Sequence, residues 1–219
     1  MPRIPANAIP TPRRLRYQVR GFISHLPVFA TGELNWQHRQ GQYEARLKLD
    51  AGPLGSRTQG STGRIVPTGL QPLRFIDRSR HERMTEFDWI RAEARFGGGD
   101  VTPLAQGTQD LASFYVQLAC LFAANAASPV RYARDTQLSL PVAGTSKAVE
   151  AWRFVLKGEE TLSLPGGRIV ARKLVRLQAR PDEPGAELWL APTLGWLPAR
   201  IRLREGKGND VDLRWDRSD

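Results

Sequence analysis

Seven residues have side chains that suit the binding of a ligand, and they are spread over most of the chain. They are Arg80, Trp89, Gln109, Asp110, Arg153, Glu159 and Trp189. An arginine can hold an anionic headgroup, and a tryptophan can line an apolar cleft. These residue types favour the binding of an amphipathic ligand over a chemical reaction, so no catalytic residue is predicted.

Four carboxylates leave an alternative open, in which the chain is a carboxylate-dependent hydrolase or transglycosylase that acts on glycosidic bonds. Two such groups hydrolyse a glycosidic bond when they lie ~5–10 Å apart in an open cleft. The candidates are Asp88, Asp110, Glu159 and Glu160. Each also has a structural explanation, because Asp88 lies on the outer face of a strand, Asp110 starts a helix, and the glutamates follow a turn at Gly158.

The motifs of several enzyme and metal-binding classes are missing. The histidines, His25, His38 and His81, have no metal-ligand spacing, and no Gly-x-Ser-x-Gly nucleophile elbow occurs. Residues 97–99 are three glycines without the Lys-Ser/Thr of a phosphate-binding loop, and they predict a hairpin turn. A single cysteine, Cys120, excludes internal disulfides and cysteine-rich metal sites. We expect no metal and no cofactor.

Alternating hydrophobicity is the commonest pattern, and it predicts strands. Residues 15–23 and 43–49 place apolar and polar side chains on opposite faces, and residues 197–204 and 211–215 form a hairpin. Further strands are expected at 28–36, 63–66, 73–80, 84–95, 138–141, 148–156, 159–164, 169–177 and 187–191. The stretches 57–63 and 96–100 are expected to be mobile loops. Many short, closely spaced strands favour an antiparallel barrel or sandwich.

One stretch in the middle of the chain, about 108–126, has helical spacing instead. Its apolar residues recur at i, i+3 and i+4, and they are Leu111, Phe114, Tyr115, Leu118, Leu121 and Phe122. Thr108 is the expected N-cap, and Asp110 places a negative charge in the first turn. The predicted fold is therefore mainly β, with a single-domain antiparallel barrel-like or strongly curved sheet and one central amphipathic helix that covers or plugs it.

The ends of the chain define the expected domain. Residues 1–14 contain four prolines and form an arm or linker, and residues 15–217 form a single β-rich domain. A split into two small domains near Pro129 is the alternative. The arm has no apolar stretch typical of a signal peptide, so we hypothesise that the sequence is a domain of a longer, exported precursor, without its signal or anchor.

The charge is strongly basic but evenly spread. Lys+Arg number 32 and Asp+Glu 22, so the formal net charge is 32 − 22 = +10, and 27 of the cations are arginine. No cluster tracks successive phosphates, which makes nucleic acid an unlikely partner. Arginines such as Arg200, Arg202 and Arg204 alternate along a strand and predict a basic outer surface that suits an anionic envelope. No apolar run is long enough to cross a membrane.

Six tryptophans lie on separate predicted strands or turns, so several can converge on one barrel interior. They are Trp36, Trp89, Trp152, Trp189, Trp196 and Trp215. A cleft floored by tryptophan and rimmed by arginine would favour an amphipathic anion as ligand. A filled interior would favour a structural or interaction protein.

Several local patterns together resemble the bacterial family of domain of unknown function 3108, over about residues 15 to 216. They are Tyr17, Gly69-Leu70-Gln71-Pro72, Gln109-Asp110-Leu111-Ala112-Ser113, Gly158-Glu159-Glu160, Glu187-Leu188-Trp189-Leu190 and Leu197-Pro198-Ala199-Arg200-Ile201. The resemblance implies a barrel-like antiparallel fold and export to the envelope of Gram-negative bacteria. It carries over no catalytic residue.

The predicted function is a non-catalytic periplasmic or envelope binding module that holds an amphipathic or cell-wall-related ligand in a β-barrel-like cleft. A lipid, a glycan fragment or a peptide fits that description. The cell-wall hydrolase and the structural protein with a filled core remain the two alternatives.

Overall fold

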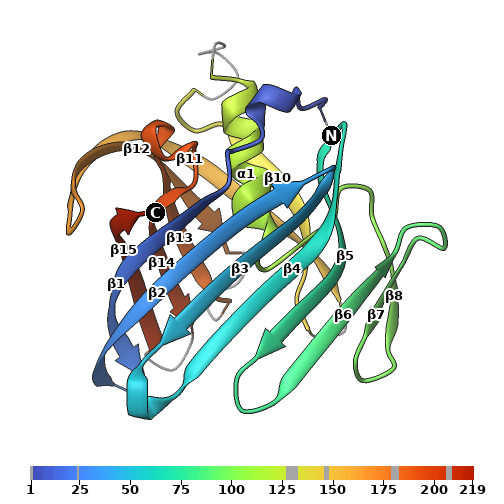
Figure 1. Ribbon diagram of the computed structural model, residues 1–219, viewed down its shortest axis with the longest axis horizontal. Helices are drawn as coiled ribbons and strands as arrows, with labels where there is room; N and C mark the ends of the chain where they lie inside the picture. The colour runs from blue at the N-terminus through green and yellow to red at the C-terminus, as the bar shows by residue number, and fades with distance from the viewer. Residues whose placement is uncertain (1, 24, 127–132, 146–147, 179–182, 206–208) are drawn as a thin grey trace.

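The structure is a computed structural model that describes residues 2–23, 25–126, 133–145, 148–178, 183–205 and 209–219. Most of these residues lie in strands (Figure 1). The elements in chain order are η1 Ala6–Ala8, β1 Arg13–Ile23, β2 Leu26–Arg39, β3 Gln42–Asp50, η2 Gly52–Leu54, β4 Ser56–Val66, β5 Gly69–Arg78, β6 Glu82–Asp88, β7 Glu93–Phe96, β8 Val101–Pro103, β9 Gln109–Asp110, α1 Ser113–Ala124, β10 Gln137–Ala143, β11 Val149–Leu164, β12 Gly167–Leu177, β13 Gly185–Leu190, η4 Pro192–Leu194, β14 Pro198–Glu205 and β15 Asn209–Ser218.

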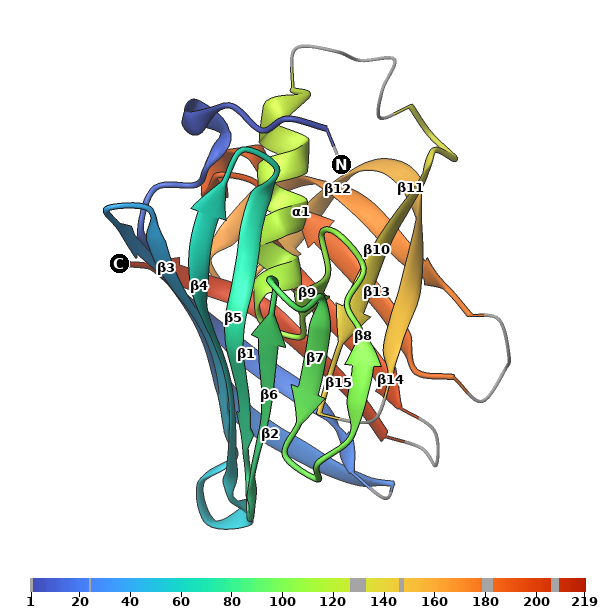
Figure 2. The same cartoon turned by 90° about the vertical axis from the view of Figure 1, so that its right-hand side faces the viewer.

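The strands of the described residues form one 15-stranded sheet, in the order β8-β7-β6-β5-β4-β3-β2-β1-β15-β14-β13-β12-β11-β10-β9. Neighbouring strands are antiparallel except β9 and β10, which pair in parallel at Gln109 and Val142. The first and last strands pair side by side, so the sheet is built outwards from β1 and β15 towards the edges β8 and β9. It curves into an open barrel (Figure 2). The predicted fold class is confirmed.

Helix α1 lies inside the curve of the sheet and fills the upper part of its interior (Figures 1 and 2). Every residue from Ser113 to Phe122 is buried, so the helix is enclosed on all sides rather than amphipathic. An all-round apolar helix is stable only when it is surrounded in this way. The core contains Trp36, Phe154 and Leu174 of the sheet packed with Phe114 and other residues of the helix.

The helix starts later than the sequence predicts, because residues 109–110 form β9 and the helix begins at Ser113. Thr108 is not the N-cap, since its hydroxyl donates to Ala105 O. Asp110 takes the capping role: its Oδ1 accepts the backbone N–H groups of Ala112 and Ser113, at 2.9 and 2.8 Å. In return, Ser113 Oγ accepts the N–H of Asp110, which completes a capping box.

Two predictions of loops and turns are wrong, and one is confirmed. Residues 57–63 belong to β4, which pairs with β3 and β5 on both sides despite its glycines. Gly158 is not a turn, because β11 continues through it with a bulge and a positive φ of 103°. Glycine tolerates this conformation without strain. The turn at residues 97–99 is confirmed, since it connects β7 and β8.

The N-terminal segment packs on the upper end of the barrel beside α1 (Figure 1). Ile4 and Ala8 are buried in the main core. Trp36 Nε1 donates a 2.8 Å hydrogen bond to Pro10 O, and Ile4 N donates to Pro67 O. This segment therefore closes the end of the barrel at which the helix terminates. In the described part of the chain, no helix is long and apolar enough to cross a membrane.

Candidate functional site

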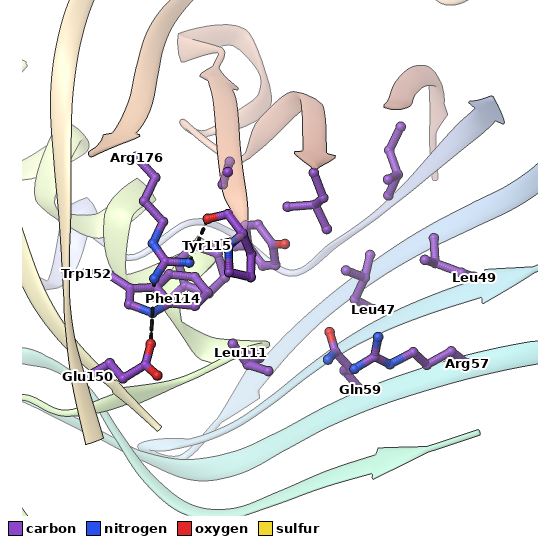
Figure 3. Close-up of a pocket in the computed structure, with 15 residues that line it drawn as sticks. Leu47, Leu49, Arg57, Gln59, Leu111, Phe114, Tyr115, Glu150, Trp152 and Arg176 are labelled. Atoms are coloured by element: carbon purple, nitrogen blue, oxygen red, sulfur yellow. Dashed lines mark hydrogen bonds and ion pairs between the residues drawn. The ribbon is translucent and has the colours of Figure 1, made fainter. Parts of the chain in front are cut away.

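A cavity of about 260 Å³ lies below the N-terminal end of α1, between the helix and the inner face of the sheet (Figure 3). Its walls are mainly apolar, and they come from both halves of the sheet. The lining residues are Leu47, Leu49, Arg57, Gln59, Leu111, Phe114, Tyr115, Glu150, Trp152, Arg176, Pro184, Gly185, Ala186, Leu203 and Leu213. A cavity of this kind suits an apolar group with a few polar anchors.

Arg176 is the most deeply buried cation of the cavity wall, with 7% of its side chain exposed. Its guanidinium stacks on the ring of Trp152, with Cζ 4.1 Å from the ring centroid. Nη1 donates to Pro184 O at 3.1 Å, and Nη2 lies 3.6 Å from Glu150 Oε2 (Figure 3). Nε has no hydrogen-bond partner among the described residues. Burial lowers the pKa of Arg176, and Glu150 and Glu183 oppose that effect.

Glu150 and Glu183 both act on the charge of Arg176, and Glu150 does so across a long contact. The carboxylate of Glu150 is 60% exposed and far from ideal hydrogen-bond distance. It also accepts a hydrogen bond from Trp152 Nε1, at 3.2 Å. A largely buried guanidinium beside an apolar cavity is therefore available to an anion, which it can bind through charge-assisted hydrogen bonds.

Arg57 and Gln59 form the polar part of the opposite side, whereas Tyr115 lies beside Phe114, near Arg176 (Figure 3). Arg57 makes a bidentate hydrogen bond to Asp77, at 2.9 and 2.6 Å, so the carboxylate of Asp77 balances its charge. The phenol of Tyr115 points into the cavity (Figure 3). Burial raises the pKa of Tyr115, so its hydroxyl stays neutral and can donate a hydrogen bond.

Among the described residues, Glu150 is the one carboxylate that lines this cavity. Glycoside hydrolysis needs a pair, which the described lining does not supply. Among the described residues, no group of three or more His, Cys, Asp or Glu side chains could hold a metal ion. The arrangement suits binding of an amphipathic anion, with its apolar part between Phe114 and the leucines and its charge near Arg176.

None of the seven residues predicted from the sequence lines this cavity. Arg80, Arg153 and Glu159 are exposed. Trp89 packs against a second, smaller apolar cluster, and its Nε1 donates to Pro72 O at 2.6 Å. Their part in ligand binding stays a prediction.

Trp189 is buried between two cations of neighbouring strands. Lys173 Nζ lies 4.8 Å and Arg200 Cζ 4.6 Å from its ring centroid, and its Nε1 donates to Glu160 Oε2 at 2.7 Å. These contacts account for its burial and for the position of Glu160. Asp88, another of the four carboxylates, accepts the backbone N–H groups of Ile90 and Arg91 in a turn.

Gln109 and Asp110 both lie in the interior and join the start of the helix to β4 and β5. Gln109 Nε2 donates to Leu70 O of β5, at 2.9 Å. Asp110 Oδ2 accepts a 2.5 Å hydrogen bond from Ser61 Oγ, which also contacts Tyr43 Oη. Burial raises the pKa of Asp110 to about 6, and the hydrogen bonds from Ser61, Ser113 and Ala112 oppose that rise.

The pKa of Asp110 predicts how stability depends on pH. The folded value of about 6 exceeds the usual 3.8, so the folded protein binds more protons than the unfolded chain between these values. Stability should therefore increase as the pH falls through this range. Relative to Asp110→Asn, which cannot titrate, the free energy of unfolding should rise by up to about 3 kcal/mol from about pH 7 to about pH 4. Urea unfolding of both proteins across this range measures it, and a difference that is independent of pH would contradict it.

The arginines of β14 are paired rather than free. Arg200 contacts Asp212 at 2.7 Å, Arg202 contacts Asp210 at 2.9 Å, and Arg204 contacts Glu187 at 3.1 Å. These acids lie on the neighbouring strands β15 and β13, where cross-strand register places opposite charges together. The sequence predicts a basic outer surface, and at these three positions acids balance the arginines, while the net charge of the chain is +10.

The curved sheet, the enclosed helix and the apolar cavity define a barrel-like β protein with an internal cavity. The chain belongs to the family described as protein of unknown function (DUF3108), whose family model matches residues 16–214. The resemblance predicted from the sequence is thus confirmed for the family. No curated protein matches the chain.

Three solved structures are similar to this chain at low sequence identity. A beta-barrel-like protein of domain of unknown function DUF1849 from Brucella abortus matches with a TM-score of 0.64 and 10% identity, over 95% of this chain and 97% of that one. A DUF1089 family protein from Pseudomonas aeruginosa matches with a TM-score of 0.42 and 10% identity, over 76% and 86%. The Pseudomonas aeruginosa MucA/MucB complex matches with a TM-score of 0.36 and 14% identity, over 94% and 51%. The first likeness supports the barrel-like fold.

Proposed function

We propose that the protein is a non-catalytic binding module of the cell envelope, which holds the apolar part of an amphipathic anion in its barrel cavity. One observation carries the proposal: the buried guanidinium of Arg176 lies at the wall of a cavity that is otherwise mainly apolar. Trp152 stacks on this guanidinium. A cleft lined by both tryptophan and arginine favours an amphipathic anion as ligand. The presence of a cavity speaks against a filled core.

The apolar walls favour a lipid-like ligand over a glycan or a peptide. Leucines and aromatic rings cannot satisfy the many hydroxyl groups of a sugar, and leaving those groups unpaired costs free energy. A single acyl chain with a carboxylate or phosphate head satisfies both the walls and Arg176. The envelope location belongs to the proposal, since the family resemblance implies it, and fractionation of cells that make the full-length protein tests it.

A cavity-filling variant tests the site directly. Ala186 lines the cavity and is buried, so Ala186→Phe should occupy the space that the acyl chain needs. We expect its affinity for a dansyl-labelled fatty acid to fall by about tenfold or more, because the buried apolar area of the ligand is lost. Fluorescence titration measures the affinity.

The matched control is Ala151→Phe, which adds the same group at an exposed position of β11. It should bind the fatty acid like the wild type. Equal affinity of Ala186→Phe and wild type, or a wild-type protein that binds no fatty acid and is consistently empty in native mass spectrometry, would refute the proposal.

A further inference from the structure

The connection between β1 and β2 carries exposed apolar side chains that the core does not use. Phe22, Leu26 and Phe29 are 50%, 69% and 74% exposed. Residues 18–32 include Arg20 and no Asp or Glu. A single exposed apolar residue is ordinary, but three on one short connection indicate a contact surface.

This hairpin extends beyond the strand next to it. The last pair between β2 and β3 is Thr31 with Asp50, whereas β2 continues to Leu26. Phe22 and Phe29 share one face with Arg20, because Arg20 and Phe29 are directly opposite each other. Leu26 lies on the other face, so the tip is apolar on both sides. The exposed Leu54 of η2 lies at the same end of the molecule (Figures 1 and 2).

The cavity extends towards the end of the barrel at which this tip lies, and we infer that its mouth is there. It is lined at that end by Leu49, Arg57 and Gly185, which lie at or next to the lower ends of β3, β4 and β13 (Figures 1 and 3). The opposite end is closed by α1 and by the N-terminal segment. A ligand that leaves the cavity therefore emerges on the side of the β1–β2 tip.

An apolar strip on the inner face of the sheet connects the cavity to the tip. Leu203 of the cavity wall pairs with Val211, and Val211 pairs with Gly21, which in turn pairs with Val28. Leu26 follows Val28 on the same face of β2, since alternate residues of a strand share a face. An acyl chain could move along this strip without crossing a polar surface.

We propose that the β1–β2 tip docks on an anionic phospholipid bilayer and holds the cavity mouth at the headgroup layer. The phenylalanines would insert at the boundary between headgroups and acyl chains, as in other interfacial proteins. The net charge of +10 draws the protein to an anionic surface. Asp210 and Asp212 of β15 lie opposite Phe22 and Arg20, and their charges are balanced by Arg202 and Arg200. The bilayer would then be the surface with which the cavity exchanges its ligand.

Flotation with lipid vesicles tests the docking in the absence of any added ligand. The wild type should float with vesicles of phosphatidylethanolamine and phosphatidylglycerol. The double variant Phe22→Ser/Phe29→Ser should bind them at least about tenfold more weakly, because two aromatic side chains no longer leave water. Both positions are exposed, so the variant should keep the wild-type melting temperature.

Ile90→Ser is the matched control, because Ile90 is 99% exposed in the turn after β6, outside the tip. It should float like the wild type. Unchanged vesicle binding by the double variant would overturn the proposal. A wild type that does not bind these vesicles would overturn it as well. A wild type that instead forms dimers, which the double variant abolishes, would assign the tip to a second copy of the chain.

The outcomes separate docking from ligand binding. The tip variant should still bind the dansyl-labelled fatty acid in vesicle-free solution, and Ala186→Phe should still float with vesicles. Docking without fatty-acid binding would refute the proposed function alone, and fatty-acid binding without docking would refute the membrane surface alone.

Discussion

Gln117→Leu should lower the free energy of unfolding by about 3 kcal/mol, although leucine has a similar size and a better helix propensity. Gln117 is fully buried on α1. Its Oε1 accepts the N–H of Leu70 at 2.7 Å, and its Nε2 donates to Thr68 O at 3.0 Å. Leucine leaves both backbone groups without these partners in the interior, and each such loss costs about 1–3 kcal/mol. Urea unfolding measures the change.

The matched control for this prediction is Gln18→Leu. Gln18 is exposed on β1, and its amide contacts only the side chain of Asp216 in the hydrogen bonds described. Replacing Gln18 by leucine should change the free energy of unfolding by less than about 0.5 kcal/mol. If the two variants are equally stable, the amide of Gln117 does not hold the helix in place.

Gly69 makes the contact with Gln117 possible. It has a φ of 111°, and a Cβ atom there would lie 2.2 Å from Gln117 Oε1. Only glycine combines this conformation with so close an approach. The Gly-Leu-x-Pro pattern that supports the family resemblance thus has a structural reason, since it holds the turn before β5 against the helix.

The strand pattern could be predicted because it is local. Apolar residues alternate strictly in β3, where Tyr43, Ala45 and Leu47 are buried and their neighbours are exposed. The helix could be predicted as well, from its i, i+3, i+4 spacing. Its start could not, because the parallel pairing of β9 with β10 involves residues more than thirty positions apart and overrides the local helical pattern.

The cavity residues were harder to predict, because strand parity decides which side chain enters the cavity. Arg153 was predicted, but Trp152 points into the cavity and Arg153, the next residue, is exposed on the other face. The sequence does not single out Arg176, because apolar residues occupy both faces of β12 around it. The pattern Leu174-Val175-Arg176-Leu177 therefore does not indicate which face of the strand is buried. The alternation of Arg176 with the fully buried Leu174 was the one available signal.

Arg57 was missed for a different reason. It lies in a stretch of small and polar residues that predicts a loop, and long-range pairing with β3 and β5 makes that stretch a strand. Its partner Asp77 is twenty residues away, on β5. Contacts of this kind depend on the sheet order, which the local sequence does not contain.

Arg176→Met should reduce the affinity for a fatty acid by about 100-fold while leaving the protein at least as stable as the wild type. A charge-assisted hydrogen bond to a buried cation contributes about 1.5–3 kcal/mol to binding. Folding, in contrast, is relieved of the cost of burying a guanidinium whose contact with Glu150 is 3.6 Å long. The partner Glu150 is 60% exposed, so it stays solvated when the arginine is removed.

Two controls make this prediction specific. The affinity for the corresponding fatty alcohol, which has no charge, should be the same in Arg176→Met and the wild type, because only the headgroup contact is lost. Arg153→Met should leave the affinity for the fatty acid unchanged, since Arg153 lies on the opposite face of β11. A loss of affinity in Arg153→Met, with none in Arg176→Met, would move the anion site to the residue that the sequence predicted, and with it the ligand to the outside of the barrel.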